Sequence, residues 1–203
     1  MTLKKLNAIA VSNTITQHSS IIKSGATCDF KFRFKSKMHD KGFIYDHNYN
    51  FISFKGNKYQ VNLHQYDIGI FAVKFNLYKH NKSKNKYSII TNTCDANVII
   101  KTVITIMLHV LNNNPNCSFC FIGSPKDNET TNNTKRFRVY KNYMQRYFDT
   151  NNFDHVIDIE QSFYSLINKK VNVIELNLKL KQLFKKEVEI TSNSFNNLTR
   201  NTK

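Results

Sequence analysis

Hydrophobic and polar residues alternate with a period of two through much of the first half of the chain. In the clearest example, residues 30–35, three phenylalanines alternate with lysine and arginine, which is typical of a strand with one buried face. Similar segments predict further strands at 43–45, 50–54, 58–63, 68–78 and 87–91. Glycine, asparagine and lysine between these segments favour short turns. The first half therefore predicts an antiparallel meander.

The second half begins with the 3.6-residue period of a helix. Residues 96–111 carry an apolar stripe, and they follow Thr93 and Asp95, two side chains suited to capping a helix. The helix is expected to end at the run of asparagines before Pro115. A compact apolar strand is predicted next, at 117–122.

A second helix is predicted at 134–148, because its large apolar side chains recur on one face: Phe137, Tyr140, Met144 and Phe148. Lys135, Arg138, Asn142 and Arg146 fall together on the other side of this helix. Segments 156–159 and 162–168 read as extended. Beyond them, residues 171–186 fit either an alternating strand or a last helix, and the pattern does not separate the two.

These elements predict an α+β fold. An antiparallel β-meander is followed by helix, strand, helix and strands, with the helices mainly on one face of the sheet. We expect residues 29–188 to form a single domain. Residues 1–28 are predicted to be a poorly ordered lead-in, and the Asn- and Ser-rich residues 189–203 a disordered polar tail.

The balance of charge is strongly basic. The 203 residues include 30 Lys and Arg against 14 Asp and Glu, which gives a formal net charge of +16. An AT-rich coding sequence explains much of the abundance of lysine and asparagine, so the number of lysines alone says little about function. A charge of this size nevertheless attracts polyanions, and nucleic acid is the commonest of these inside cells.

The sequence predicts a cytoplasmic protein without membrane contact. The first twenty residues contain no continuous apolar run of the kind found in secretory signals. Lys101 and His109 interrupt the most apolar stretch, 98–111, whose length suits a core helix better than a membrane span.

Cys117 and Cys120 have the C-x-x-C spacing found in zinc and redox sites. No second ligand pair has matching spacing, and alternation along a strand would point the two sulfurs to opposite faces. The histidines are scattered, and Ser124 lacks the glycine pattern of a nucleophile elbow. We therefore predict no catalytic residue, no metal site and no cofactor.

Several short motifs in the second half resemble an uncharacterised family of small Bacteroidota proteins that is defined only as a domain of unknown function. Thr91-Asn92-Thr93-Cys94-Asp95 is similar to its Thr-Asn-Asn-Gly-Asp, with Cys94 in place of the glycine. The strand ending in Gly123-Ser124 and the segment Arg136-Phe137-Arg138-Val139-Tyr140 are similar to its Gly-Ser and Arg-Thr-Arg-Leu-Tyr, although a longer loop separates them here. The resemblance covers residues 30–170 in element order. It implies a sheet followed by helix, strand, helix and strands, and no activity.

The segment from the strand end to the second helix predicts an anion site. A helix N-terminus offers unpaired N–H groups, glycine permits close backbone approach, and arginine forks match phosphate oxygens. The candidate phosphate-binding residues are Gly123, Ser124, Lys135, Arg136, Arg138, Tyr140 and Lys141. The alternative is that the two arginines pair with internal carboxylates such as Asp127, Glu129, Asp158 or Glu160, and that Tyr140 belongs to the core.

A second cationic feature, on the first predicted strand, is a weaker candidate. Lys31, Arg33 and Lys35 would share one face of the first strand, where solvated lysines are common. The Lys- and Asn-rich run 79–86 is interpreted as a solvated turn. From these observations we predict non-catalytic binding to the phosphate backbone of nucleic acid, with little sequence specificity. The alternatives are an accessory protein of a phage, plasmid or defence system that docks an acidic protein, and a metal-dependent nuclease or phosphate-ester enzyme. The oligomeric state stays open.

Overall fold

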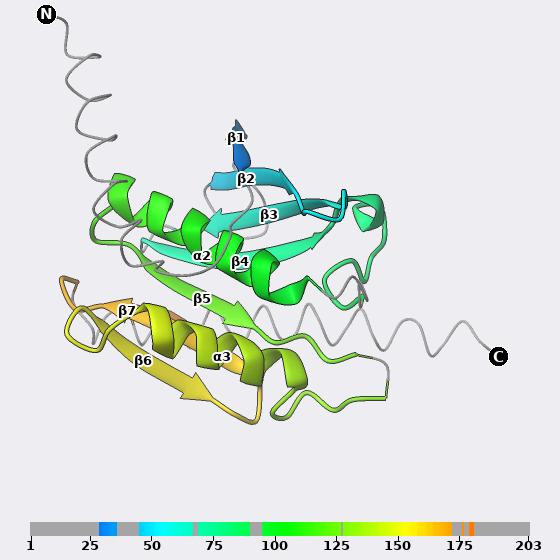
Figure 1. The fold of residues 1–203 in the computed structure, drawn as a ribbon. Coiled ribbons are helices and arrows are strands. Elements are labelled where there is room, and N and C mark those ends of the chain that lie inside the picture. Colours follow the sequence, from blue (N-terminus) through cyan, green and yellow to red (C-terminus); the bar gives the residue numbers. More distant parts are fainter. Residues whose placement is uncertain are drawn as a thin grey trace, which may run out of the picture.

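The computed structural model describes residues 29–35, 45–66, 69–89, 95–126 and 128–171, together with Leu176, Lys179 and Leu180, and for 32–35 it describes the backbone alone. These residues form a seven-stranded sheet with the order β1-β2-β3-β4-β5-β7-β6 (Figure 1). The strands are β1 (Phe30–Lys35), β2 (Tyr45–Ile52), β3 (Lys58–Gln65), β4 (Ile70–Leu77), β5 (Ser118–Ile122), β6 (Phe153–Asp158) and β7 (Phe163–Asn168). The helices are η1 (Tyr78–His80), α2 (Ala96–Asn113) and α3 (Lys135–Tyr147).

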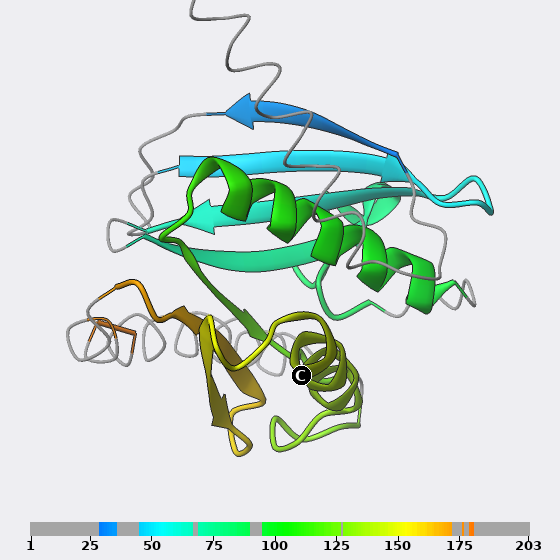
Figure 2. The ribbon, with the colours of Figure 1, turned by 60° about the vertical axis from the view of Figure 1, so that its left-hand side comes forward.

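The sheet is mixed, and its one parallel pair decides which loops meet. Strands β1 to β4 form the predicted antiparallel meander, and β5, β7 and β6 are also antiparallel to one another. Strand β5 lies parallel to β4. Helix α2 connects the two strands and returns the chain to the end of the sheet where β4 begins (Figure 2). Parallel strands end at the same end of a sheet. The residues after β4 and the residues after β5 therefore lie at one end of the molecule.

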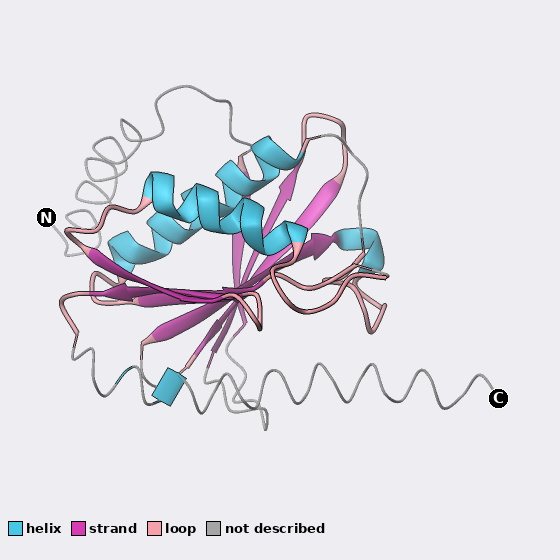
Figure 3. Cartoon of the chain, turned by 90° about the horizontal axis from the view of Figure 1, so that it is seen from below, coloured by secondary structure: helices cyan, strands magenta, loops and turns pink. Residues whose placement is uncertain are grey.

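The main core lies between the sheet and the two helices. Residues that pair across neighbouring strands point to the same face of the sheet. Phe51, Tyr59 and Leu77 form such a row, and all three are buried. Both α2 and α3 cover this face (Figure 3). Nine of the eighteen residues of α2 are buried. The predicted fold class, including the position of the helices on one face, is confirmed.

Helix α2 would by length and composition be able to cross a membrane, yet half of that stretch is buried inside the protein. It packs on the strands as the core helix that the sequence predicts. His109, on the same helix, contacts the rings of Phe30 and Tyr49, which also contact each other. Burial lowers the pKa of this histidine.

A smaller cluster of buried residues lies apart from the main core: Ile70, Phe163, Ile167, Leu176 and Leu180. Leu176, Lys179 and Leu180 are helical, which favours the helix over the strand at these three positions. Cys117 belongs to the main core and Cys120 packs against the smaller cluster. The two sulfurs therefore point to opposite faces of the sheet, as alternation predicts. Burial raises the pKa of the Cys117 thiol to about 12.

Some predictions of local structure need correction. The strand expected at 87–91 is wrong in its described part, because Tyr87 and Ser88 lie in a turn. Strand β2 starts at Tyr45, well before the predicted residue 50. Asp95 stands at the N-cap position of α2, but its side chain makes no capping hydrogen bond. The predictions for residues 1–28, 43–44, 91–94 and 189–203 lie outside the described residues.

Candidate functional site

Helix α3 starts one residue after a threonine that caps it. The Thr134 hydroxyl accepts a hydrogen bond from the Phe137 N–H at 3.2 Å and donates one to the Gly123 carbonyl at 2.6 Å. The Thr134 N–H itself donates to the Ser162 hydroxyl at 2.9 Å. A capping threonine satisfies one of the free donors of the first turn. These bonds also connect the start of α3 to the residue after β5 and to the residue before β7.

Gly123 is required by packing. A Cβ atom at this position would lie 2.5 Å from the Cβ and from the backbone nitrogen of Phe137. The Gly123 N–H donates to the Ser162 carbonyl at 2.8 Å, so both backbone polar groups of the glycine are used inside the protein. The glycine therefore lets α3 approach β5. Packing against Phe137 is enough to explain why position 123 is a glycine, without the predicted contact of its backbone with a phosphate.

A carboxylate of the protein lies against the start of α3. Glu129 accepts a hydrogen bond from the Lys135 N–H at 2.7 Å and another from the Lys126 N–H at 3.1 Å. The bond from Lys135 is the main reason why the pKa of Glu129 is lowered, and Lys126 and Arg138 contribute. An ionised carboxylate at a helix N-terminus is the arrangement predicted here for an external phosphate. The protein thus supplies its own anion.

The two arginines make different contacts, although a single residue separates them. The partly buried Arg136 guanidinium donates to the carbonyls of Tyr87 at 3.1 Å, Ser88 at 2.6 Å and Ser124 at 3.3 Å. The exposed Arg138 donates to the Asn133 carbonyl at 2.5 Å. Neither forms an ion pair with a carboxylate in the described part of the chain. The expected carboxylate partners are thus replaced by carbonyls, and Arg136 anchors the loop after β4 to the start of α3.

Tyr140 packs in the core, as the alternative interpretation held. Its ring contacts those of Phe75 and Phe121, with centroids 5.7 and 5.4 Å away. Burial raises the pKa of Tyr140 to about 12, against an opposing effect of Arg136. Internal ring contacts therefore account for this tyrosine.

The outward side of α3 is cationic. Lys135, Arg138, Asn142 and Arg146 are exposed, Lys141 is partly exposed, and the helix contains no acidic residue. Within the described ranges none of these cations forms an ion pair. The structure therefore brings together Gly123, Ser124 and Arg136 in internal contacts. It leaves Lys135, Arg138 and Lys141 turned toward solvent.

A second cationic region was not predicted as a site. We call it the lysine corner, and it consists of the β2–β3 turn (52–58) and of η1 with the following loop (78–86). It contains six lysines and no carboxylate: Lys55, Lys58, Lys79, Lys82, Lys84 and Lys86. The two segments meet where the Lys58 ammonium lies 3.9 Å from the centre of the Tyr78 ring. Asn81 also donates to Gln60 of the adjoining strand β3 at 2.5 Å. The signal in the sequence was the lysine run, which alone looks like a solvated turn.

Exposed apolar side chains accompany these lysines. Phe54 is 66% exposed, Ile52 61% and Tyr78 45%, which are among the highest values for large apolar residues in the described chain. On β1, by contrast, Phe30 turns into the core and Lys31 is exposed, as alternation predicts. The side chains of Arg33 and Lys35 lie outside the described part.

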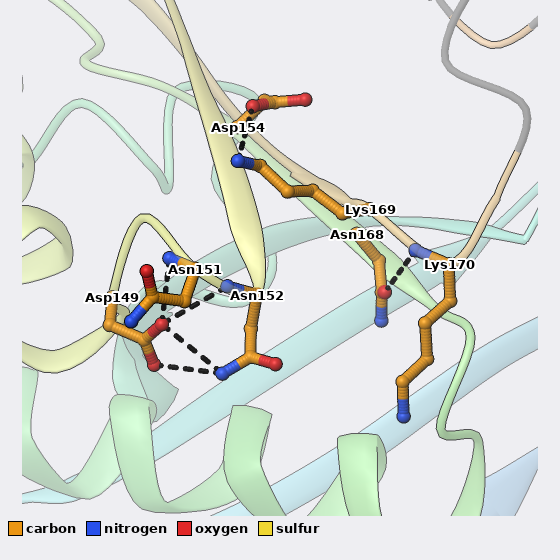
Figure 4. Close-up of polar contacts among 7 residues, drawn as sticks. All are labelled: Asp149, Asn151, Asn152, Asp154, Asn168, Lys169 and Lys170. Atoms are coloured by element: carbon orange, nitrogen blue, oxygen red, sulfur yellow. Dashed lines mark hydrogen bonds and ion pairs between the residues drawn. The ribbon is translucent and has the colours of Figure 1, made fainter.

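At the opposite end of the sheet, charged groups have internal partners (Figure 4). Asp149 follows α3 and accepts hydrogen bonds from the backbone N–H groups of Asn151 and Asn152 at 2.9 and 3.0 Å. These bonds, with one from the Asn152 side chain, lower the pKa of Asp149. Asp154 forms an ion pair with Lys169 at 3.3 Å. We call this region the Asp149 turn.

The described residues contain no group of three or more His, Cys, Asp or Glu side chains placed to hold a metal ion. Comparison with protein-family models, with curated proteins and with solved structures finds no significant match. The resemblance to the Bacteroidota family therefore stays a prediction. The function has to be argued from the surface described above.

Proposed function

We propose that the protein binds the phosphate backbone of nucleic acid without catalysing a reaction on it. The observation that carries this proposal is the lysine corner, whose two segments contain six lysines and no carboxylate of their own. Helix α3 begins at the same end of the sheet (Figure 1), and its first turn adds the exposed Lys135 and Arg138. Clustered cations bind a polyanion by neutralising phosphates and releasing counterions.

Exposed rings beside lysines favour an unpaired strand. Phe54 and Tyr78 present apolar surface within the lysine corner. Bases of single-stranded nucleic acid stack on such side chains while the phosphates contact neighbouring cations. An acidic protein would use the same charges and would not need the rings. We therefore expect single strands to bind more tightly than duplex of the same length.

Fluorescence anisotropy with labelled oligonucleotides over a range of salt concentrations tests the proposal. The corner variant replaces three exposed lysines by glutamine: Lys55, Lys79 and Lys82. The control variant replaces three exposed cations near the Asp149 turn: Arg146, Lys169 and Lys170. In the corner variant the slope of log affinity against log salt should fall by about 2 for a single strand, since each phosphate contact contributes about 0.7.

The control variant should keep most of the slope of the wild-type protein. Equal losses in both variants would mean that charge acts diffusely and that the corner is no site. If the wild-type protein does not bind oligonucleotides at low salt, the ligand is not nucleic acid, and an acidic protein becomes the leading alternative.

A further inference from the structure

A cavity of about 310 Å³ lies between the starts of α2 and α3, beside the end of β4 and the loop that follows it. This volume is at the lower end of the range of small-molecule sites, about 300–1,000 Å³. Most of its wall is apolar or aromatic, formed by Phe75, Leu77, Ile99, Ile100, Val139 and Tyr140. The cavity therefore suits a small apolar group.

Charged side chains contribute to the same cavity. Lys86, Lys126, Lys135 and Arg136 line it together with one carboxylate, Glu129. Arg136 is held by three carbonyls, and Glu129 by the backbone N–H groups of Lys126 and Lys135. Cations outnumber the carboxylate, so the cavity carries an excess of positive charge next to its apolar wall.

Tyr140 adds a polar group to the wall. The residue is partly buried, its ring contacts those of Phe75 and Phe121, and it lines the cavity. A phenolic hydroxyl can donate a hydrogen bond to a molecule bound beside it.

We propose that this cavity binds a small organic anion with an apolar, planar body and one negatively charged group. The body occupies the space beside Phe75, Ile99 and Val139. The anionic group lies beside the side chains of Lys126 and Lys135, while the Glu129 carboxylate keeps the two backbone N–H groups. Apolar contact and a charge-assisted hydrogen bond are both needed, because each alone gives little affinity in a site of this size. The inference goes beyond nucleic-acid binding, since the ligand is a small molecule and the apolar wall that holds it is separate from the lysine corner; Lys86 and Lys135 belong to both surfaces.

Three probes separate the two requirements in isothermal titration calorimetry with the full chain. 1-Naphthyl phosphate has both parts of the proposed ligand, 1-naphthol lacks the anion, and inorganic phosphate lacks the apolar body. We expect naphthyl phosphate to bind at least about tenfold more tightly than either of the others, a difference of about 1.4 kcal/mol. Equal binding of inorganic phosphate and naphthyl phosphate would overturn the proposal, since only surface charge would then be acting.

Two substitutions at the cavity wall test its location. Val139 is 42% exposed and Ala96 is exposed, so Val139→Trp and Ala96→Trp narrow the cavity from α3 and from α2 without disturbing the core. Each should weaken naphthyl phosphate about tenfold or more. Gln145→Trp, at an exposed position of α3 that does not line the cavity, is the matched control and should leave binding within about twofold of wild type. Unchanged binding in both wall variants would disprove the assignment.

Glu129→Gln should change the affinity for naphthyl phosphate in the opposite direction. It removes the internal carboxylate, so this variant should bind naphthyl phosphate more tightly than the wild-type protein does. Weaker binding would contradict the placement of the anionic group. None of the three tryptophan variants changes a charge. Their effect on naphthyl phosphate is therefore distinguishable from a failure of nucleic-acid binding, which depends on the lysine corner.

Discussion

The lysine corner and the Asp149 turn handle charge in opposite ways. At the Asp149 turn the carboxylates have internal partners: Asp149 accepts hydrogen bonds from backbone N–H groups of the turn after α3, and Asp154 pairs with Lys169. In the lysine corner, six lysines and three exposed apolar side chains lie together without a carboxylate. Both regions belong to the same basic chain, so composition alone does not explain the difference.

The comparison shows where a partner is to be sought. A high lysine content spreads cations over a whole surface, and most of them are balanced or solvated. A site for a polyanion requires a region where acids are missing, and such a region can be recognised only in the folded chain. The start of α3 illustrates the point, because its motif is attractive but its donors are taken by Glu129 and Thr134.

The largest effect is expected from the glycine under α3. Gly123→Ala should lower the free energy of unfolding by about 3 kcal/mol, because the added methyl group meets backbone atoms of Phe137 that cannot move aside freely. Gly56→Ala, in the lysine corner, has open space around it and should cost only about 1 kcal/mol through its positive φ of 76°.

Urea unfolding of the two glycine variants measures both values, and oligonucleotide binding of the folded protein adds a second readout. If Gly123→Ala is as stable as the wild-type protein but no longer binds oligonucleotides, the glycine serves ligand approach after all. That result would restore the start of α3 as the contact for the nucleic-acid backbone and would weaken the contrast with the lysine corner.

The next effect separates the two arginines. Arg136→Ala should lower the free energy of unfolding by about 2 kcal/mol, since hydrogen bonds from a charged group to three carbonyls are lost. Arg138→Ala, exposed and with one carbonyl contact, should change stability by less than about 0.5 kcal/mol. For oligonucleotide binding we expect the larger effect from Arg138→Ala. Arg138→Ala should reduce the salt slope by about 0.7 for a single strand and Arg136→Ala should not.

Thermal and urea unfolding, with anisotropy titrations on the same samples, check this pair. A loss of salt slope in a stable Arg136→Ala variant would show that the guanidinium contacts phosphate and that its carbonyl contacts are incidental.

Much of the fold could be predicted because its signals are local. The alternation of Phe30 with Lys31 and the helical spacing of Phe137 and Met144 depend only on neighbouring residues, and the structure places them as predicted. Tyr87 and Ser88 were wrongly placed in a strand because the alternation there is short. Their carbonyls instead bind Arg136, which lies 49 and 48 positions later. No local pattern carries that information.

The candidate site was predictable only in part, for the same reason. Helix α3 and its outward cations follow from periodicity. The use of Glu129 as an internal anion depends on how the loop after β5 folds back, and a glutamate in a polar loop carries no distinct signal. The lysine corner requires 52–58 to lie beside 78–86, which the register of β3 with β4 decides. Pairing the predicted strands as an antiparallel meander places these lysines at the same end of the sheet.

The smallest effect concerns pH and the Asp149 turn. His155 on β6 bonds to the Tyr164 hydroxyl, and burial lowers the pKa of His155, while Asp154 and Asp149 oppose that shift. A histidine with a lowered pKa in the folded protein is neutral there, whereas in the unfolded chain it takes up a proton near pH 6.5. The stability it contributes is therefore complete above about pH 6.5 and falls as the pH drops toward the folded pKa.

Titration of the His155 imidazole by NMR should give a pKa below 6.5, and Asp154→Asn should lower that pKa further by removing an opposing charge. Asp158→Asn is the control on the same strand, because Asp158 bonds to the Gln161 N–H and has no part in the shift of His155. A pKa that rises in the Asp154 variant, or that changes equally in both, would mean that charges at this end of the sheet are not coupled in pairs. The contrast with the lysine corner would then rest on the number of charges alone.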